Sequence, residues 1–198
     1  MATIFEDDFN SYENGDLVGQ GGWLHRAYDT GVIDVQDSVV FEGAKAISAG
    51  NTTKYERVKK QGTAQADGKI TVYMRHTHND IKTIFQVMEG ETICFNVYLH
   101  SDGNITYYNG SFHTLLSGYQ TDHWYCIEIE WRSSDHKVRY RIDGGDWSDW
   151  VNPWNTWSAG VDRIDVQMEP GVGKYCYLDY IAENPYVPVK PRSHGYIF

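Results

Sequence analysis

Apolar and polar residues alternate with a period of two along most of this 198-residue chain. In residues 92–100 every odd-numbered position is apolar, and residues 70–75 and 164–169 alternate in the same way. Side chains of a strand point alternately to its two faces, so this period predicts strands that turn one face toward a core. Because no segment combines a helical period with capping residues, we expect an all-β chain.

Turn-forming residues separate these runs at short intervals. Asn109-Gly110 and Asp143-Gly144-Gly145 are examples, and such residues supply the positive φ of tight hairpins. The spacing predicts about a dozen short strands packed as an antiparallel β-sandwich or barrel. We expect one domain over residues 1–183. Residues 184–198 hold three of the five prolines, so they are predicted to form an extended C-terminal tail.

The charge balance excludes several classes of partner. The chain has 17 basic and 27 acidic residues and a net charge of -10, which disfavours nucleic acid and anionic membrane surfaces. No apolar run approaches the roughly 20 residues of a membrane helix, so no membrane insertion is expected. The N-terminal residues lack the basic and apolar segments of a secretory signal. Cys94, Cys126 and Cys176 lie in apolar runs and are predicted to be reduced and buried.

Two alternating runs flank the polar turn RSSDH at residues 132–136 and predict a β-hairpin. The register that pairs apolar with apolar side chains also pairs acid with base: Glu128 faces Arg141, and Glu130 faces Arg139. Such cross-strand pairs contribute about 0.2–1 kcal/mol each. An arginine partner lowers the pKa of a carboxyl group, which makes it a poor general acid for a glycosidase. We therefore assign no catalytic residue.

Four of the seven tryptophans fall within eleven residues: Trp147, Trp150, Trp154 and Trp157. Pro153 lies among them and predicts a loop. Buried, the cluster is a hydrophobic plug at one end of the fold. Exposed, it is a platform on which the flat apolar faces of sugars can stack. The sequence leaves both interpretations open.

Two further groups of side chains are candidate ligand contacts. One is expected on the non-core side of neighbouring strands and combines rings with hydrogen-bonding groups; it comprises Tyr73, Arg75, Asn96, Tyr98 and His100. The other is a polar strip on one strand, without an obvious basic complement; it comprises Asp165, Gln167 and Glu169. Either group could hydrogen-bond sugar hydroxyls, and either could instead be a solvated or packed sheet face.

Several phrases of the chain resemble the concanavalin A-like lectin/glucanase superfamily, including laminin-G-like modules. They are the opening FEDDFNSY at 5–12 with GQGGW at 19–23, the central HWYCIEIEW at 123–131 with YRIDGG at 140–145, and the closing YLDYI at 177–181. The resemblance spans about residues 3–183 and implies a jelly-roll β-sandwich.

The resemblance also bears on the site. Laminarinase-type glucanases of the superfamily carry a Glu-x-Asp-x-Glu strand; here the nearest match has Glu130 at the Asp position and Arg132 at the second Glu position. Many relatives hold a structural calcium ion between the first and last strands. The matching positions here are Asp8, with Glu6 or Asp7, and Asp179. A structural calcium ion is therefore an expectation.

The leading functional hypothesis is a non-catalytic β-sandwich module that binds a glycan or a cell-surface polymer. An extracellular or virion-surface setting is expected, and the C-terminal tail could dock onto a partner subunit or virion neighbour in a homo-oligomer. One alternative is a glycoside hydrolase or polysaccharide lyase. A second alternative is a purely structural decoration or assembly protein, in which the sandwich only packs against its neighbours.

Overall fold

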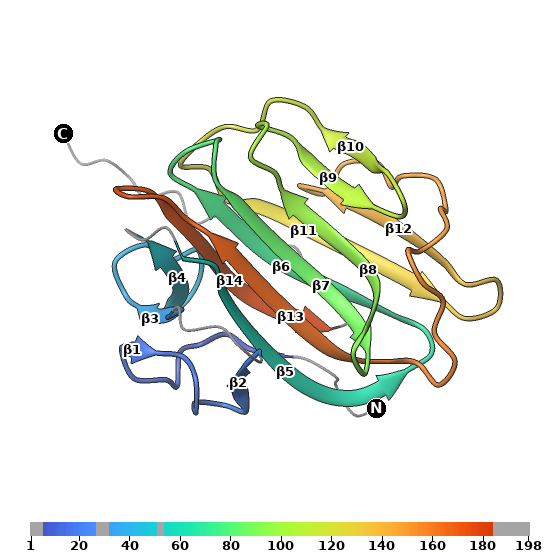
Figure 1. Ribbon diagram of the computed structural model, residues 1–198, viewed down its shortest axis with the longest axis horizontal. Coiled ribbons are helices and arrows are strands. Elements are labelled where there is room, and N and C mark those ends of the chain that lie inside the picture. The colour runs from blue at the N-terminus through green and yellow to red at the C-terminus, as the bar shows by residue number, and fades with distance from the viewer. Residues whose placement is uncertain (1–5, 27–31, 51–53, 184–198) are drawn as a thin grey trace.

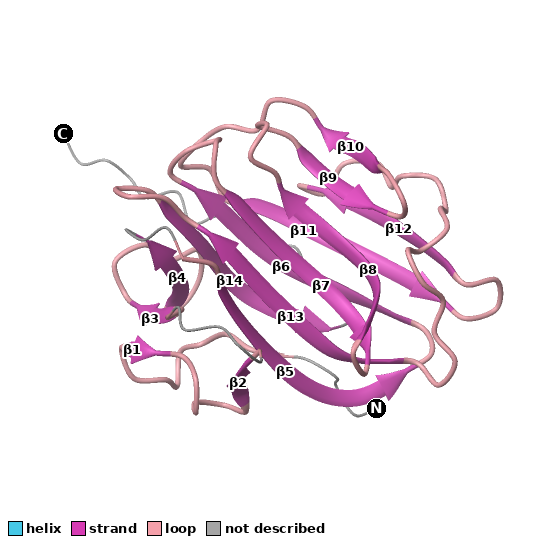
Figure 2. Ribbon diagram, viewed as in Figure 1, coloured by secondary structure: helices cyan, strands magenta, loops and turns pink. Residues whose placement is uncertain are grey.

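The computed structural model describes residues 6–26, 32–50 and 54–183, and in this part of the chain every regular element is a strand (Figure 2). Fourteen strands form two seven-stranded sheets, and all their pairings are antiparallel (Figure 1). The predicted all-β antiparallel sandwich is confirmed. The predicted tail at 184–198 lies outside the described residues. No helix of the described residues is long and apolar enough to cross a membrane.

One sheet, named here the β6 sheet, has the order β1-β3-β4-β14-β6-β11-β12. Its strands are β1 (Gly15–Asp16), β3 (Asp34–Gln36), β4 (Ala46–Gly50), β14 (Tyr175–Glu183), β6 (Gly68–His76), β11 (Tyr125–Arg132) and β12 (Lys137–Ile142). The other, the β8 sheet, has the order β10-β9-β8-β7-β13-β5-β2. Its strands are β10 (Phe112–Leu116), β9 (Ile105–Tyr108), β8 (Thr92–Leu99), β7 (Lys82–Glu89), β13 (Val161–Glu169), β5 (Glu56–Gln65) and β2 (Trp23–His25).

The core lies between the two sheets and is filled by the alternate positions that the sequence predicted. In β8, Phe95 and Val97 are fully buried members of the core, and in β11 so are Ile127 and Ile129. Phe95 meets the core-facing Trp131 of β11 at a ring-centroid distance of 5.5 Å, which joins the two sheets. Burial of such side chains is the main stabilising contribution of the sandwich.

All three cysteines are free and buried, as predicted. Burial raises the pKa of the Cys94 and Cys126 thiols to about 11 and that of the Cys176 thiol to about 12. A thiol with so high a pKa carries little thiolate at neutral pH, so these residues behave as small apolar side chains.

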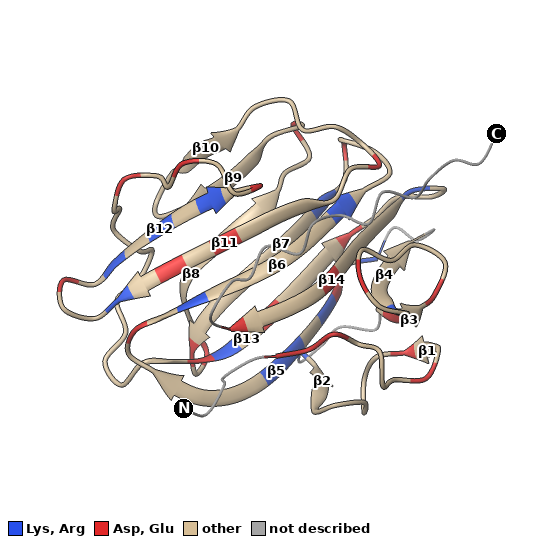
Figure 3. Cartoon of the chain, turned by 180° about the vertical axis from the view of Figure 1, so that it is seen from behind, with Lys and Arg blue, Asp and Glu red and all other residues tan. Residues whose placement is uncertain are grey.

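The β11–β12 hairpin has the predicted register. Trp131 pairs with Val138, so that Glu130 lies opposite Arg139 and the remaining acid–base pair follows. The alternate side chains of the hairpin, such as Ile127 and Ile129, face the core. Its acidic and basic side chains therefore project from the outer face of the β6 sheet. Figure 3 shows the acidic segments of β11 beside the basic segments of β12.

The expectation that β6 and β8 are neighbouring strands is wrong. The two strands belong to different sheets, so Tyr73 and Arg75 project from one outer face of the sandwich. Asn96 and Tyr98 project from the opposite outer face, and His100 follows directly after β8. Periodicity identifies the outward side of a strand but not the sheet to which the strand belongs.

Candidate functional site

The glutamate ladder of β11 is fully engaged by basic side chains. Arg141 donates two hydrogen bonds, of 2.5 and 2.7 Å, to the buried Glu128 carboxylate, and the Lys69 ammonium lies 3.4 Å from it. Arg139 holds Glu130 in the same way, with its Nε 2.7 Å from Oε2. Glycosidases require one carboxyl group that can donate a proton, and these two carboxylates accept hydrogen bonds from cations instead. The ladder is therefore an ion-pair network.

Two of the clustered tryptophans, Trp147 and Trp150, lie against the arginines of this ladder. Arg141 and Arg139 lie over the Trp147 ring, each 4.6 Å from its centroid. Arg139 lies 4.5 Å and Arg132 4.0 Å from the Trp150 centroid. Guanidinium groups and indoles thus alternate in the order Arg141, Trp147, Arg139, Trp150, Arg132, which we call the arginine–tryptophan stack.

The stack decides the role of these two rings. Two guanidinium groups lie within 4.6 Å of the centroid of each indole, and cation–π contacts of this kind stabilise by about 0.5–2 kcal/mol each. A sugar ring would compete with these arginines for the ring faces. Trp147 and Trp150 are therefore poorly placed to form a stacking platform, although they line the outer face of the β6 sheet.

The other two tryptophans divide between core and surface. Trp157 is 2% exposed, donates its indole N–H to the Ala66 carbonyl at 2.9 Å and packs edge-on against Phe95. Trp154 is 40% exposed and contacts Tyr108 at 4.8 Å. Its backbone N–H bonds to the Cys94 carbonyl of β8. The cluster is thus neither wholly a plug nor wholly a platform: of its four rings, Trp154 alone is exposed enough to stack.

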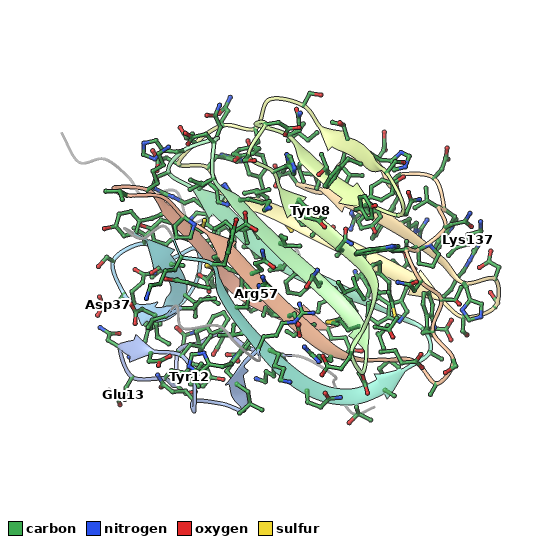
Figure 4. The ribbon with its side chains drawn as sticks, viewed as in Figure 1. Tyr12, Glu13, Asp37, Arg57, Tyr98 and Lys137 are labelled. Carbon is green, nitrogen blue, oxygen red and sulfur yellow. The ribbon has the colours of Figure 1, made fainter. Side chains whose placement is uncertain are left out.

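Trp154 extends a row of rings over the outer face of the β8 sheet. Tyr108 of β9 lies between Trp154 and Phe112, 5.1 Å from the latter, and Phe112 in turn contacts Tyr98 at 5.3 Å and His100 at 4.9 Å. We call these five residues the ring strip. Phe112 is 54% exposed. The strip therefore has two large exposed rings, Phe112 at its centre and Trp154 at one end. Tyr98 is labelled in Figure 4.

Hydrogen-bonding groups surround the ring strip. Asn109 and Ser111 flank the β9–β10 turn beside Phe112, and Ser111 is exposed. Beneath the strip, the Asn96 side-chain oxygen accepts the Tyr108 N–H at 2.9 Å. Asn96 Nδ2 and Thr106 Oγ1 are buried without a hydrogen-bond partner among the described residues. Exposed rings beside amide and hydroxyl groups are the composition of a polar small-molecule site.

The polar strip of β13 has basic partners, contrary to expectation. Arg163 lies two residues before Asp165 on the same face and donates two hydrogen bonds to it, of 2.5 and 2.7 Å. Arg26 also reaches Asp165, at 3.1 Å, and Lys82 reaches Glu169 at 2.7 Å. The Gln167 amide donates to Glu169. Only β7 separates this polar strip from the ring strip, but the carboxylates of the polar strip are occupied.

The two predicted contacts on the β6 sheet are covered. Tyr73 is 6% exposed and stacks on Phe41 with a centroid distance of 3.8 Å. Arg75 bonds to Asp122 at 2.8 Å and lies over Tyr177. Neither side chain therefore joins Asn96, Tyr98 and the rest of the predicted group.

The residues predicted to hold calcium do not fit that ion as placed. Asp179 is buried, and its carboxylate accepts backbone N–H groups from Phe41, Glu42 and Tyr180. Burial outweighs these donors and raises its pKa to about 7. Glu6 and Asp8 are exposed.

The segment that precedes β1 is instead joined to β14 by the protein's own backbone. Asp7 and Ile181 exchange two backbone hydrogen bonds of 2.8 Å. Among the described residues no group of three or more His, Cys, Asp or Glu is placed to hold a metal ion. Calcium binding thus stays a prediction that this arrangement does not favour.

Sequence reasoning missed Tyr108 and Phe112, and it missed the contacts of the arginines with Trp147 and Trp150. Tyr108 and Phe112 flank the Asn109-Gly110 turn, and a ring on each side of a tight hairpin turn is a readable signal. Arg163 precedes Asp165 by two residues, which places both on one strand face. The contact of Trp154 with Tyr108 depends on the path of the loop and has no local signal.

Neither family models nor curated protein sequences match this chain. Solved structures do. A sialidase has a TM-score of 0.71 at 15% identity over 92% of this chain, which spans only 18% of the sialidase chain.

Two further structures match over nearly their whole length. The catalytic domain of a glycoside hydrolase family 131 protein from Coprinopsis cinerea has a TM-score of 0.65 at 11% identity, covering 97% of this chain and 99% of that one. A β-glucanase of Bacillus licheniformis has a TM-score of 0.60 at 12% identity, covering 94% and 99%. Identities this low show the fold alone. The chain has a jelly-roll β-sandwich fold like that of these structures.

Proposed function

We propose that this protein is a non-catalytic carbohydrate-binding module that holds a glycan on the ring strip of the β8 sheet. The observation that carries the proposal is the pair of exposed rings, Phe112 and Trp154, joined through Tyr108. The apolar C–H face of a sugar can lie on such rings while its hydroxyl groups reach the surrounding amides and hydroxyls.

The composition of the strip favours a neutral glycan. Tyr98, Tyr108, Phe112 and Trp154 carry no charge, and Asn109 supplies a neutral amide beside them. A neutral sugar requires stacking and hydrogen bonds rather than an ion pair, and this surface offers both. Similar folds among glycoside hydrolases and a lyase support a carbohydrate ligand for this β-sandwich.

The state of the acids supports binding without cleavage. Asp165 and Glu169 are four residues apart on β13, which corresponds to about 13 Å along a strand. Retaining glycosidases need their two carboxyl groups about 5–5.5 Å apart and inverting ones about 6.5–9.5 Å. Both acids, like Glu128 and Glu130 on the other sheet, are also held by basic side chains.

The first experiment compares two exposed aromatic residues on opposite sheets. Binding of neutral oligosaccharides is measured by a glycan array and then by isothermal titration. We expect Trp154→Ala to weaken binding about tenfold, because the change removes one of the two exposed rings on which the sugar would lie. Tyr175→Ala is the matched control, since Tyr175 is 38% exposed and lies in the β6 sheet. Equal affinity of both variants would remove the ring strip from the proposal.

A glycoside hydrolase or lyase is the second candidate, favoured by the activities named for the structures of similar fold. Release of reducing ends or unsaturated products from the bound glycan distinguishes it from the first. We expect no turnover by the wild-type protein. Turnover by the wild-type protein would overturn the non-catalytic assignment, and loss of that turnover in a Glu130→Gln variant would place the chemistry at the glutamate ladder.

The setting in which such a module would act remains a prediction. A virion or other extracellular surface, a homo-oligomer and docking through residues 184–198 are compatible with a glycan-binding sandwich. Light scattering gives the oligomeric state of the full chain. Comparison with a chain that ends at Glu183 shows whether residues 184–198 contribute to that state.

A further inference from the structure

Six aromatic residues lie together on the outer face of the β6 sheet, on the opposite side of the sandwich from the ring strip. Tyr73 stacks on Phe41 at a centroid distance of 3.8 Å, and Phe41 contacts Trp124 at 6.1 Å. Three tyrosines of β14 continue the group through ring contacts of 6.2 and 6.3 Å. We call these residues the aromatic cluster: Phe41, Tyr73, Trp124, Tyr175, Tyr177 and Tyr180.

Part of the aromatic cluster is open to solvent. Tyr73 and Tyr177 are buried at its base. Tyr175 is 38% exposed, and the other three rings are half-buried. Aromatic side chains carry a large apolar area and are enriched where one protein segment binds another. The cluster therefore offers apolar surface to a further segment of protein.

Two carboxylates border the aromatic cluster on the side of β1 and β3. Asp34 of β3 lies opposite Ser48 of β4, and Ser48 lies opposite Tyr177 of β14, so the three share one row of the sheet. Asp16 of β1 faces Asp34 directly. Like charges that face each other across two strands are destabilising, and a cation beside them would relieve the repulsion.

Three further carboxylates lie at the Tyr180 end of the cluster. Burial, and then the nearby charges of Glu42, Glu6 and Asp8, raise the pKa of the Tyr180 phenol. Within residues 6–26, 32–50 and 54–183, neither these three carboxylates nor the two on β1 and β3 form an ion pair with a basic side chain. The cluster is thus apolar at its centre and negatively charged along its border.

The sequence of residues 184–198 complements such a surface. The segment contains Lys190 and Arg192 and no acidic residue, although the whole chain has a net charge of -10. Its prolines, Pro185, Pro188 and Pro191, recur every three residues. A polyproline II helix has three residues per turn, so prolines at this spacing lie on one side of it. Segments of this kind bind surfaces that are lined with aromatic rings.

The end of β14 brings this segment to the aromatic cluster. Glu183 pairs with Ile70 of β6, and Tyr73 lies three residues farther along that strand, about 10 Å away. Tyr175, at the far end of the cluster, lies about 25 Å from Glu183 along β14. Residues 184–192 in polyproline II conformation would span about 28 Å. They are therefore long enough to cross the cluster of their own molecule.

We propose that residues 184–192 dock as a polyproline II segment on the aromatic cluster of the same chain. The prolines lie against the rings, and Lys190 and Arg192 lie beside the carboxylates at the border. The docked segment covers one outer face of the sandwich and leaves the ring strip on the other face open. The proposal is independent of glycan binding.

Limited proteolysis of the full chain tests the contact. Trypsin cleaves after Arg192, whereas Lys190 is followed by proline and resists cleavage. We expect Tyr175→Ala to raise the rate of cleavage after Arg192 about tenfold, because loss of an exposed ring favours the undocked segment, on which the protease acts. Trp154→Ala, on the opposite sheet, is the control and should leave the rate unchanged. Equal rates in the wild type and in Tyr175→Ala would contradict the proposal.

Dilution distinguishes docking within one chain from docking between two. Docking within the chain gives a cleavage rate constant after Arg192 that does not depend on protein concentration. Protection that is lost on dilution would assign the segment to a neighbouring copy and would overturn the proposal.

Replacement of the prolines tests the conformation without a change in the sandwich. A full chain with Pro185→Ala, Pro188→Ala and Pro191→Ala should show a shifted indole N–H signal for Trp124 in NMR spectra and an unshifted one for Trp154. Val189→Ala is the control, since Val189 lies on another side of the three-residue turn, and it should shift the Trp124 signal less. An unmoved Trp124 signal in the triple variant would show that the prolines do not contact the cluster.

Discussion

The two outer faces of the sandwich use the same residue type in opposite ways. On the β6 sheet, Trp147 and Trp150 are interleaved with arginines that are themselves bonded to glutamates. On the β8 sheet, Trp154 contacts other aromatic rings and keeps part of its surface in solvent. The comparison teaches that the neighbours of an indole, and not its distance from other tryptophans in the sequence, decide whether a ligand can stack on it.

The largest expected difference in stability is between variants of the last two tryptophans of the cluster, Trp154 and Trp157. Trp157→Ala removes a buried ring from the core beside Phe95 and should lower the free energy of unfolding by about 4 kcal/mol. Trp154→Ala should lower it by about 1 kcal/mol or less, since its ring is partly exposed. Urea unfolding followed by circular dichroism measures both. Similar losses in the two variants would show that Trp154 is a core residue and not a binding one.

The next effect distinguishes the two rungs of the glutamate ladder. Glu128→Ala leaves Arg141 and Lys69, both largely buried, without their carboxylate and should cost about 3 kcal/mol. Glu130→Ala breaks a pair whose side chains are about 30% exposed and should cost about 1 kcal/mol or less. Chemical unfolding at constant salt tests this order. A larger loss of stability from Glu130→Ala than from Glu128→Ala would contradict this ranking. It would mean that Glu130, through Arg139, is needed to hold the arginine–tryptophan stack together.

A pH effect of intermediate size is expected from Asp179 on the β6 sheet. Its folded-state pKa, about 7, lies above its ordinary value of 3.8, because burial disfavours the charged form. As pH rises the unfolded chain releases this proton first, so stability should fall between about pH 4 and pH 7. The slope should become shallower in an Asp179→Asn variant, and the remainder is expected from Glu56, because burial also raises the pKa of that carboxyl to about 7. An unchanged slope in the variant would contradict the assignment to Asp179.

The smallest effect probes the stack itself. Arg139→Lys keeps the positive charge beside Glu130 but loses the planar group between Trp147 and Trp150, and should cost about 1 kcal/mol. Lys137→Arg on the same strand is the control, and it should leave stability within about 0.5 kcal/mol. Tryptophan fluorescence should change in the first variant only. No change in either stability or fluorescence would mean that the alternating order contributes little.

Local pattern predicted much of the fold. The period of two located strands, and the register of the β11–β12 hairpin followed from matching apolar and charged pairs, because a one-residue slip would exchange its two faces. The assignment of β6 and β8 to different sheets could not be predicted, since both strands carry the same period. Pairings between strands distant in sequence depend on the whole topology.

The candidate site was predicted in part. Trp154, Asn96, Tyr98 and His100 were identified and do lie along β8 on the outer face of the β8 sheet. The contacts of Trp147 and Trp150 with the arginines were missed. These contacts form only because the loop at 143–151 turns back and runs along β12, which brings the two rings next to the arginines. The alternating faces of a strand can be predicted from the period of its sequence, but the path of a loop has no such signal.

That return of the chain has a consequence for how copies of the molecule meet. Val151 exchanges two backbone hydrogen bonds with Val138, so the segment that carries Trp147 and Trp150 runs along the open edge of β12. An uncovered edge strand is a template on which another chain can add a strand and begin to aggregate. Here the edge is occupied by the protein's own backbone and flanked by the stack. Growth of the sheet into a polymer through β12 would first require this segment to detach.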